Sequence, residues 1–124
     1  MIEIRSEDLS VDEVARQMKS PKIGAILTYL GTVREFPEGI GLEFGDDKNP
    51  SVIQKLGEIR ERAIDGFDVE DVAIVHRVGF LGISENILLV AISASHRGPA
   101  FAACKQIIDD IKDFHRLWKR EVRR

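Results

Sequence analysis

The 124-residue sequence contains one cysteine and has no long apolar run. Because Cys104 has no intramolecular partner, a secreted scaffold held together by disulfide bonds is excluded. The longest apolar runs, such as residues 87–92, are far too short to cross a bilayer. The first ten positions include the acidic residues Glu3, Glu7 and Asp8, where a signal peptide needs a basic start and an apolar stretch. We therefore expect a cytoplasmic protein.

Basic charge is also scarce, which counts against a general nucleic-acid binder. Acidic residues outnumber basic ones by 21 to 18, and the formal net charge is -3. The length fits one domain, residues 1–124, with a single core. From Lys112 onward, however, there are six basic residues and two acidic ones, so this terminus is basic and the remainder is acidic. Such a distribution indicates either an anion site or a solvated tail.

Hydrophobic periodicity predicts an α+β fold with three helices and a mostly antiparallel sheet. Helices and strands do not alternate regularly, so a doubly wound fold is disfavoured. Capping-box spacing and Asn49-Pro50 mark the first two helix starts. The expected strands are 2–4, 24–33, 72–78 and 86–93, with a further strand starting at 42–44 and a polar turn at 45–49. The expected helices are 11–18, 50–64 and 99–118, the last with an apolar stripe of Phe101, Cys104, Ile108, Ile111, His115 and Trp118.

The loop at residues 95–99 is the first candidate site, because it leaves a buried strand and enters the longest helix. Free backbone N–H groups at a helix start favour an anion, and Arg97 adds a bidentate donor for phosphate or carboxylate. His96 can donate a hydrogen bond or carry a proton near neutral pH. A capped loop with two exposed polar side chains is the alternative, and local sequence leaves both open.

Three lysines at positions 105, 112 and 119 form the second candidate. On a helix this spacing returns to one face every two turns, with about 10 Å between neighbours. A desolvated lysine beside an apolar stripe is a usable base or amine nucleophile. The pattern alone favours the alternative, in which lysine stems cover apolar surface and the charges stay in water.

Other polar residues give weaker signals. Arg34 ends a predicted strand at a glycine-containing loop, from which it could reach a ligand. His76 lies inside a predicted strand and His115 on the apolar stripe, so we expect both to be packed histidines. Scattered histidines and one cysteine give no metal-ligand spacing, so no metal site is predicted.

Four segments together resemble the large, catalytic subunit of molybdopterin synthase, in the family's order and spacing. They are GAILTYLGTVRE (24–35), VAIVHRVG (72–79), SASHRGPAF (93–101) and IKDFHRLWKRE (111–121). The resemblance implies an α/β-hammerhead fold. It also implies conversion of cyclic pyranopterin monophosphate (precursor Z) into molybdopterin by installation of two dithiolene sulfurs.

The resemblance further implies the sulfur donor and the assembly. The sulfur arrives as a thiocarboxylate on the C-terminal Gly-Gly of a small ubiquitin-like subunit, whose tail enters a pocket of the large subunit. A homodimer of large subunits forms the centre of a heterotetramer. Neither a metal nor another cofactor is needed for the sulfur transfer.

Residue roles also follow from the resemblance. Lys112 falls on the family lysine nearest the thiocarboxylate and Lys119 on the second essential lysine, whereas Lys105 matches no family site. The positions that match pterin- and phosphate-binding residues are Arg34, His96 and Arg97. Arg120 and Glu121 complete the Trp-Lys-Arg-Glu segment, and we expect them to bind substrate as well. The polar segment 44–50 departs from the family pattern.

Two alternatives to an enzyme stay open. One is a module that binds a Gly-Gly tail or a pterin without turnover, and the other is a nucleic-acid protein with a basic C-terminus. Lys112 and Lys119 favour the enzyme, whereas net acidity and the lack of an aromatic-basic pattern count against nucleic acid. The enzyme hypothesis requires these cations to converge with Arg97 on one anion, within a chain or across a subunit boundary.

Overall fold

A four-stranded sheet lies at the centre of the computed structural model, which describes residues 1–45 and 50–124. Its strand order is β1 (Ile2–Arg5), β4 (Asp71–Arg77), β6 (Asn86–Ala94) and β2 (Ala25–Thr32). The β1–β4 pair is parallel and the other pairs are antiparallel, so the prediction of a mostly antiparallel sheet is confirmed. Strands β4 and β6 are rich in valine, isoleucine and leucine, which suits their buried central positions.

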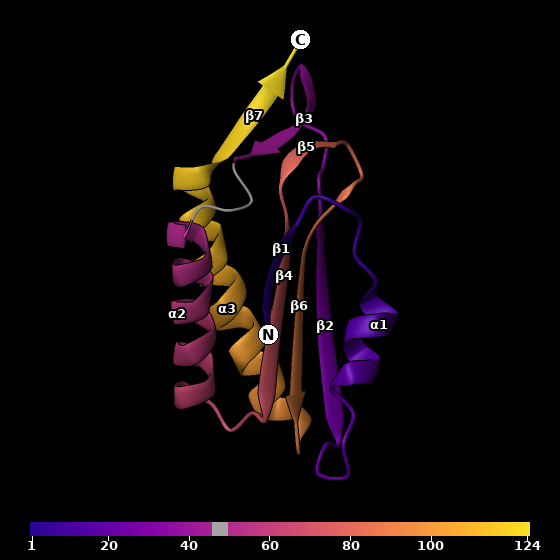
Figure 1. Cartoon of the computed structure of the whole chain (residues 1–124), viewed down its shortest axis with the longest axis vertical. Helices are drawn as coiled ribbons and strands as arrows, with labels where there is room; N and C mark the ends of the chain where they lie inside the picture. The colour runs from indigo at the N-terminus through magenta and orange to yellow at the C-terminus, as the bar shows by residue number, and fades with distance from the viewer. Residues whose placement is uncertain (46–49) are drawn as a thin grey trace.

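Helices cover both faces of this sheet (Figure 1). The helices α2 (Pro50–Gly66) and α3 (Arg97–Trp118) pack on one face, and α1 (Val11–Gln17) packs on the other. Ser10 caps α1, because its Oγ accepts a hydrogen bond from the Glu13 backbone N–H at 3.2 Å. The main core lies between the sheet and the α2–α3 layer, where Leu56 and Ile107 are fully buried.

A second, three-stranded antiparallel sheet lies beyond the C-terminal end of α3 (Figure 1). Its order is β5 (Gly79–Gly82), β3 (Gly39–Phe44) and β7 (Lys119–Arg123). Strand β7 follows α3 without a connecting loop, and its pairing with β3 sets Lys119 opposite Phe44. Between the expected strands 72–78 and 86–93 the sequence predicted a turn containing Gly79, Gly82 and Ser84, but β5 lies there. The predicted row of lysines placed Lys119 on the helix, but Lys119 begins β7. Both predictions are wrong.

Several predicted boundaries and faces differ from the structure. The last helix begins at Arg97, two residues before the predicted start at Pro99. Its predicted stripe is partly wrong, because Phe101 is 58% exposed and Ile107 is buried instead. Helix α2 begins at Pro50 as predicted, whereas the cap at Asn49 and most of the predicted turn at 45–49 lie outside the described residues.

Candidate active site

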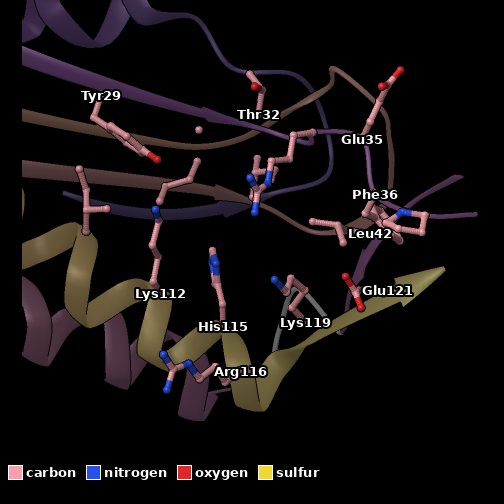
Figure 2. Close-up of a pocket in the computed structure, with 16 residues that line it drawn as sticks. Tyr29, Thr32, Glu35, Phe36, Leu42, Lys112, His115, Arg116, Lys119 and Glu121 are labelled. Carbon is pink, nitrogen blue, oxygen red and sulfur yellow. The ribbon is translucent and has the colours of Figure 1, made fainter. Parts of the chain in front are cut away.

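A pocket of about 830 Å³ lies between the edge strand β2, the loop that follows it, and the C-terminal end of α3 (Figure 2). Strand β2 contributes Tyr29, and the loop after it contributes Arg34. Helix α3 contributes Lys112 and His115, and β7 contributes Lys119. The volume is in the range of sites that enclose a small molecule.

Positive charge predominates on the pocket walls. Four cationic side chains and two carboxylates line the pocket. The cations are Arg34, Lys112, Arg116 and Lys119, and the carboxylates are Glu35 and Glu121. Arg34 and the two lysines are exposed, and none has an ion pair or side-chain hydrogen bond within residues 1–45 and 50–124. Unpaired cations in a concave site focus a positive potential, so the pocket attracts anions.

Side chains alternate along β7, so its first three residues point to different faces of the strand. Lys119 and Glu121 line the pocket, and Glu121 also accepts a hydrogen bond from Arg123 at 3.1 Å. Arg120 lies on the other face of the strand, where its guanidinium pairs with the Glu43 carboxylate at 2.9 Å. Arg120 is therefore outside the pocket although both its sequence neighbours are inside.

His96 and Arg97 lie at the opposite end of α3, and both are exposed. His96 is the N-cap residue and makes no side-chain capping hydrogen bond. Fifteen helical residues from Arg97 to Lys112 correspond to about 22 Å along the axis, and only Lys112 lines the pocket. The structure thus brings together Arg34, Lys112, Lys119 and Glu121, and it leaves apart His96, Arg97 and Arg120.

Lys105 shares the seven-residue spacing but does not line the pocket. Its Nζ lies 2.9 Å from the Asp109 carboxylate, and this hydrogen bond raises the pKa of Lys105. Lys119 begins β7 and so no longer belongs to the helical row. The spacing grouped Lys105 with Lys112 and Lys119, but only the last two line the pocket, and the shared helix face that it predicted is wrong.

Two histidines pair beneath the pocket. His76 is completely buried, and its Nε2 lies 2.8 Å from Nε2 of His115. Burial lowers the pKa of His76 to about 4. Burial first, and then the charges of His76, Lys119 and Lys112, lower the pKa of His115 to about 3. The prediction of two packed histidines is confirmed, but His115 also lines the pocket, which its spacing of three from Lys112 could have indicated.

Tyr29 is a second lining residue that the sequence did not single out. Its hydroxyl points toward the pocket (Figure 2). Gly31, two residues further along β2, faces the same side, and a Cβ there would lie 3.3 Å from the Tyr29 ring. The missing side chain at Gly31 therefore leaves room for the tyrosine to lie along the wall.

Other chemistry has little support in the part of the chain that the structure describes. No group of three or more potential metal-ligating side chains gathers there. Cys104 is buried in α3, and burial raises the pKa of its thiol, which disfavours the reactive thiolate. No described helix is long and apolar enough to span a membrane.

Comparisons with known proteins give a consistent result. The family model for MoaE protein matches residues 4–114. The molybdopterin synthase catalytic subunit of Pyrococcus abyssi is 37% identical over 120 residues, covering 95% of this chain and 81% of the relative. The crystal structure of molybdopterin synthase from Staphylococcus aureus matches with a TM-score of 0.85 and 29% identity, covering 98% of this chain and 90% of that one. Molybdopterin cofactor biosynthesis protein E from Burkholderia multivorans matches with a TM-score of 0.81 and 34% identity, covering 90% and 75%.

Proposed function

The chain belongs to the MoaE family of molybdopterin synthase catalytic subunits, and from this membership we propose that it transfers sulfur in molybdenum cofactor biosynthesis. Its substrate is precursor Z, and its product is the dithiolene of molybdopterin. The sulfur donor is the thiocarboxylated C-terminus of a small ubiquitin-like subunit. The observation that carries this proposal is one pocket lined by Arg34, Lys112 and Lys119, which make no ion pair or side-chain hydrogen bond with the described residues.

The pocket supplies fixed positive charge where this reaction needs it. Precursor Z carries a cyclic phosphate, and the donor tail ends in a thiocarboxylate, so both reactants are anions. We propose that Lys112 lies nearest the thiocarboxylate and that Lys119 stabilises negative charge as it develops at the attacked centre. Arg34 offers a bidentate donor for the phosphate. These roles require no metal ion or other cofactor.

We propose that His96 and Arg97 join this site from a second copy of the chain, because neither lines the pocket and about 22 Å of helix separates Arg97 from Lys112. In the proposed homodimer, the exposed loop of one copy lies against the pocket of the other. Arg97 then provides a second guanidinium for the phosphate, and His96 provides a hydrogen-bond donor. The substrate pocket is thus completed at a subunit boundary.

Arg120 and Glu121 have different proposed roles. Glu121 lines the pocket and is oriented by its hydrogen bond to Arg123. Arg120 acts indirectly, since its ion pair with Glu43 ties β7 to β3 and so holds Lys119 in place. Its contribution to substrate binding is therefore smaller than that of the residues inside the pocket.

We also propose that residues 1–124 act as one domain within a heterotetramer of two large and two small subunits. Relatives are named catalytic subunits, which supports a separate sulfur-carrying partner. A cytoplasmic location suits this chemistry, because a reducing compartment keeps sulfur nucleophiles from forming disulfides.

Reconstitution tests the proposed function. Purified protein, precursor Z and a small partner with a thiocarboxylated Gly-Gly terminus should yield molybdopterin, detected as its dithiolene by mass spectrometry. The same partner with an ordinary carboxylate terminus is the control and should yield none. Binding of both reactants without product would favour a binding module, and failure to bind either reactant would contradict the proposal.

A further inference from the structure

The pair formed by His76 and His115 connects the core to the pocket wall. His76 lies in β4 and is completely buried. Its Nδ1 is 2.6 Å from the backbone carbonyl oxygen of Arg77, and its Nε2 is 2.8 Å from Nε2 of His115. His115 lies in α3 and lines the pocket, so the pair runs from a backbone carbonyl to the site.

The hydrogen bonds fix which ring nitrogens carry protons. A carbonyl oxygen can only accept, so Nδ1 of His76 carries a proton and donates a hydrogen bond to the backbone carbonyl oxygen of Arg77. Both rings are neutral at pH 7, because burial lowers both pKa values. Nε2 of neutral His76 is then an acceptor, and Nε2 of His115 must donate to it. The remaining nitrogen, Nδ1 of His115, therefore keeps its lone pair.

This lone pair is accessible from the pocket. Within residues 1–45 and 50–124, the one buried side-chain nitrogen or oxygen without a hydrogen-bond partner is Nε of Arg5. Nδ1 of His115 has no hydrogen-bond partner among the described residues and is not among their buried unpartnered atoms, and His115 lines the pocket. Figure 2 shows the ring between Lys112 and Lys119.

Neighbouring rings keep the imidazole of His115 in this orientation. The Phe44 ring centroid lies 5.1 Å from that of His115 and 4.7 Å from that of His76. The Trp118 ring packs on His76 at 4.6 Å. An imidazole held by a hydrogen bond and by aromatic contacts presents its free nitrogen in one direction.

The surroundings of His115 are mostly cationic. The titratable and charged groups around it are Lys112 and Arg116 from α3, Lys119 and Glu121 from β7, Arg34 and Glu35 from the loop after β2, and His76 from β4. A carboxylate at this position would cancel part of the positive charge that attracts anions. A neutral imidazole accepts a hydrogen bond without that loss.

We propose, given the sulfur-transfer function, that His115 is a substrate-binding residue whose Nδ1 accepts a hydrogen bond from an N–H group of the pterin heterocycle. The pterin ring system carries N–H donors, whereas its phosphate and the thiocarboxylate need the cations. His76 is the positioning residue, because it fixes the tautomer of His115 through the Nε2–Nε2 hydrogen bond. The pocket thereby recognises the neutral heterocycle and the anionic groups with different walls.

Two matched substitutions separate this role from packing. His115→Phe and His115→Asn both lose the hydrogen bond to His76, so they share that structural cost. Phenylalanine keeps the aromatic packing but has no acceptor, whereas the asparagine amide oxygen can stand near the position of Nδ1. A packing role predicts that phenylalanine is the milder change. The acceptor role predicts the reverse.

The measurement is the affinity for precursor Z by calorimetric titration, without the sulfur-carrying partner and with thermal unfolding as the folding check. We expect His115→Phe to weaken binding about tenfold and His115→Asn to recover part of that loss. Wild-type affinity in His115→Phe, or weaker binding by His115→Asn than by His115→Phe, would overturn the proposal. No binding by the wild-type protein would overturn the proposed function as well, so the two failures are distinguishable.

Nitrogen NMR of the unmodified protein provides a second test that needs no variant. Only three histidines have to be assigned. At pH 7 the spectrum should show Nδ1 of His115 without a proton and Nδ1 of His76 with one, and precursor Z should shift the Nδ1 signal of His115. A protonated Nδ1 on His115, or a signal that precursor Z leaves unchanged, would overturn the proposal.

Discussion

The two ends of α3 carry similar residue types in very different surroundings. At the N-terminal end, His96 and Arg97 are exposed, and neither makes a side-chain hydrogen bond to the described residues. At the C-terminal end, Lys112 and His115 face β2 across a pocket. Cations and a histidine form a site within the chain only where another element supplies the opposite wall. No described element of the same chain forms a pocket wall opposite His96 and Arg97.

The helix dipole has opposite signs at the two ends of α3. The C-terminal end of a helix carries partial negative charge, which stabilises a cation in the last turn such as Arg116. The N-terminal end carries partial positive charge, so Arg97 is unfavourably placed until an anion approaches. The helix dipole therefore favours a cation at the C-terminal end and disfavours Arg97 at the N-terminal end, so Arg97 gains from contact with a phosphate.

Removal of one lysine at the C-terminal end should have the largest effect. Lys112→Ala should lower dithiolene formation at least about a hundredfold, because a charge that stabilises the transition state is lost. The reconstituted assay measures this, with circular dichroism as the folding check. Lys105→Ala is the matched control, since Lys105 lies two turns away on the same helix and outside the pocket. A near-normal yield from Lys112→Ala would remove the lysine from the mechanism.

Mixed dimers test whether the two ends meet across a subunit boundary. Lys112→Ala and Arg97→Ala should each be impaired alone. In a hybrid of the two variants, one pocket has both substitutions and the other has neither. Random mixing should therefore restore about a quarter of wild-type activity. A mixture no more active than its components would mean that Arg97 and Lys112 do not share a pocket.

The pair of His76 and His115 should make stability depend on pH, whereas the exposed His96 should not. The folded-state pKa values of His76 and His115 lie below the unfolded value of 6.5, at about 4 and about 3. Their stabilising contribution is complete above pH 6.5 and is lost as the pH falls toward those values. As the pH falls through this window, each of the two histidines should lower the free energy of unfolding by up to about 1.4 kcal/mol per pH unit.

Urea unfolding between pH 7 and pH 5 measures that slope. His115→Phe should reduce the slope, because one of the two buried histidines is gone. His96→Gln is the control and should leave the slope unchanged, since His96 is exposed. A stability that does not change between pH 7 and pH 5 would contradict the neutral pair.

The smallest effect should follow from Arg120→Ala. Arg120 pairs with Glu43 on the face of β7 away from the pocket, and both side chains are exposed. Exposed ion pairs contribute about 0–1 kcal/mol, so product formation should stay within about threefold of wild type. A loss as large as that of Lys112→Ala would show that Arg120 contacts substrate directly.

The sequence predicted those helices and strands whose structure follows from the pattern of their own residues. Strands β4 and β6 are continuous apolar segments, and α3 has an apolar stripe, so local patterns sufficed. Strand β7 could not be found this way, because Lys119–Arg123 contains one apolar residue, Val122, among charged ones. It is a strand because it pairs with β3, which lies about 80 residues earlier in the chain.

The candidate site was predictable in part for the same reason. Family resemblance located Arg34, Lys112 and Lys119, and the structure places them around one pocket. His115 was assigned to packing because it lies on the apolar stripe, but its partner His76 comes from a different element. A hydrogen bond between distant segments leaves no signal in local spacing.

A crystal structure with precursor Z bound would show whether this pocket binds the substrate. We expect the cyclic phosphate within hydrogen-bond distance of Arg34 and of Arg97 from a second copy, with the heterocycle beside Lys112 and His115. Precursor Z bound elsewhere on the protein, with this pocket empty, would contradict that expectation.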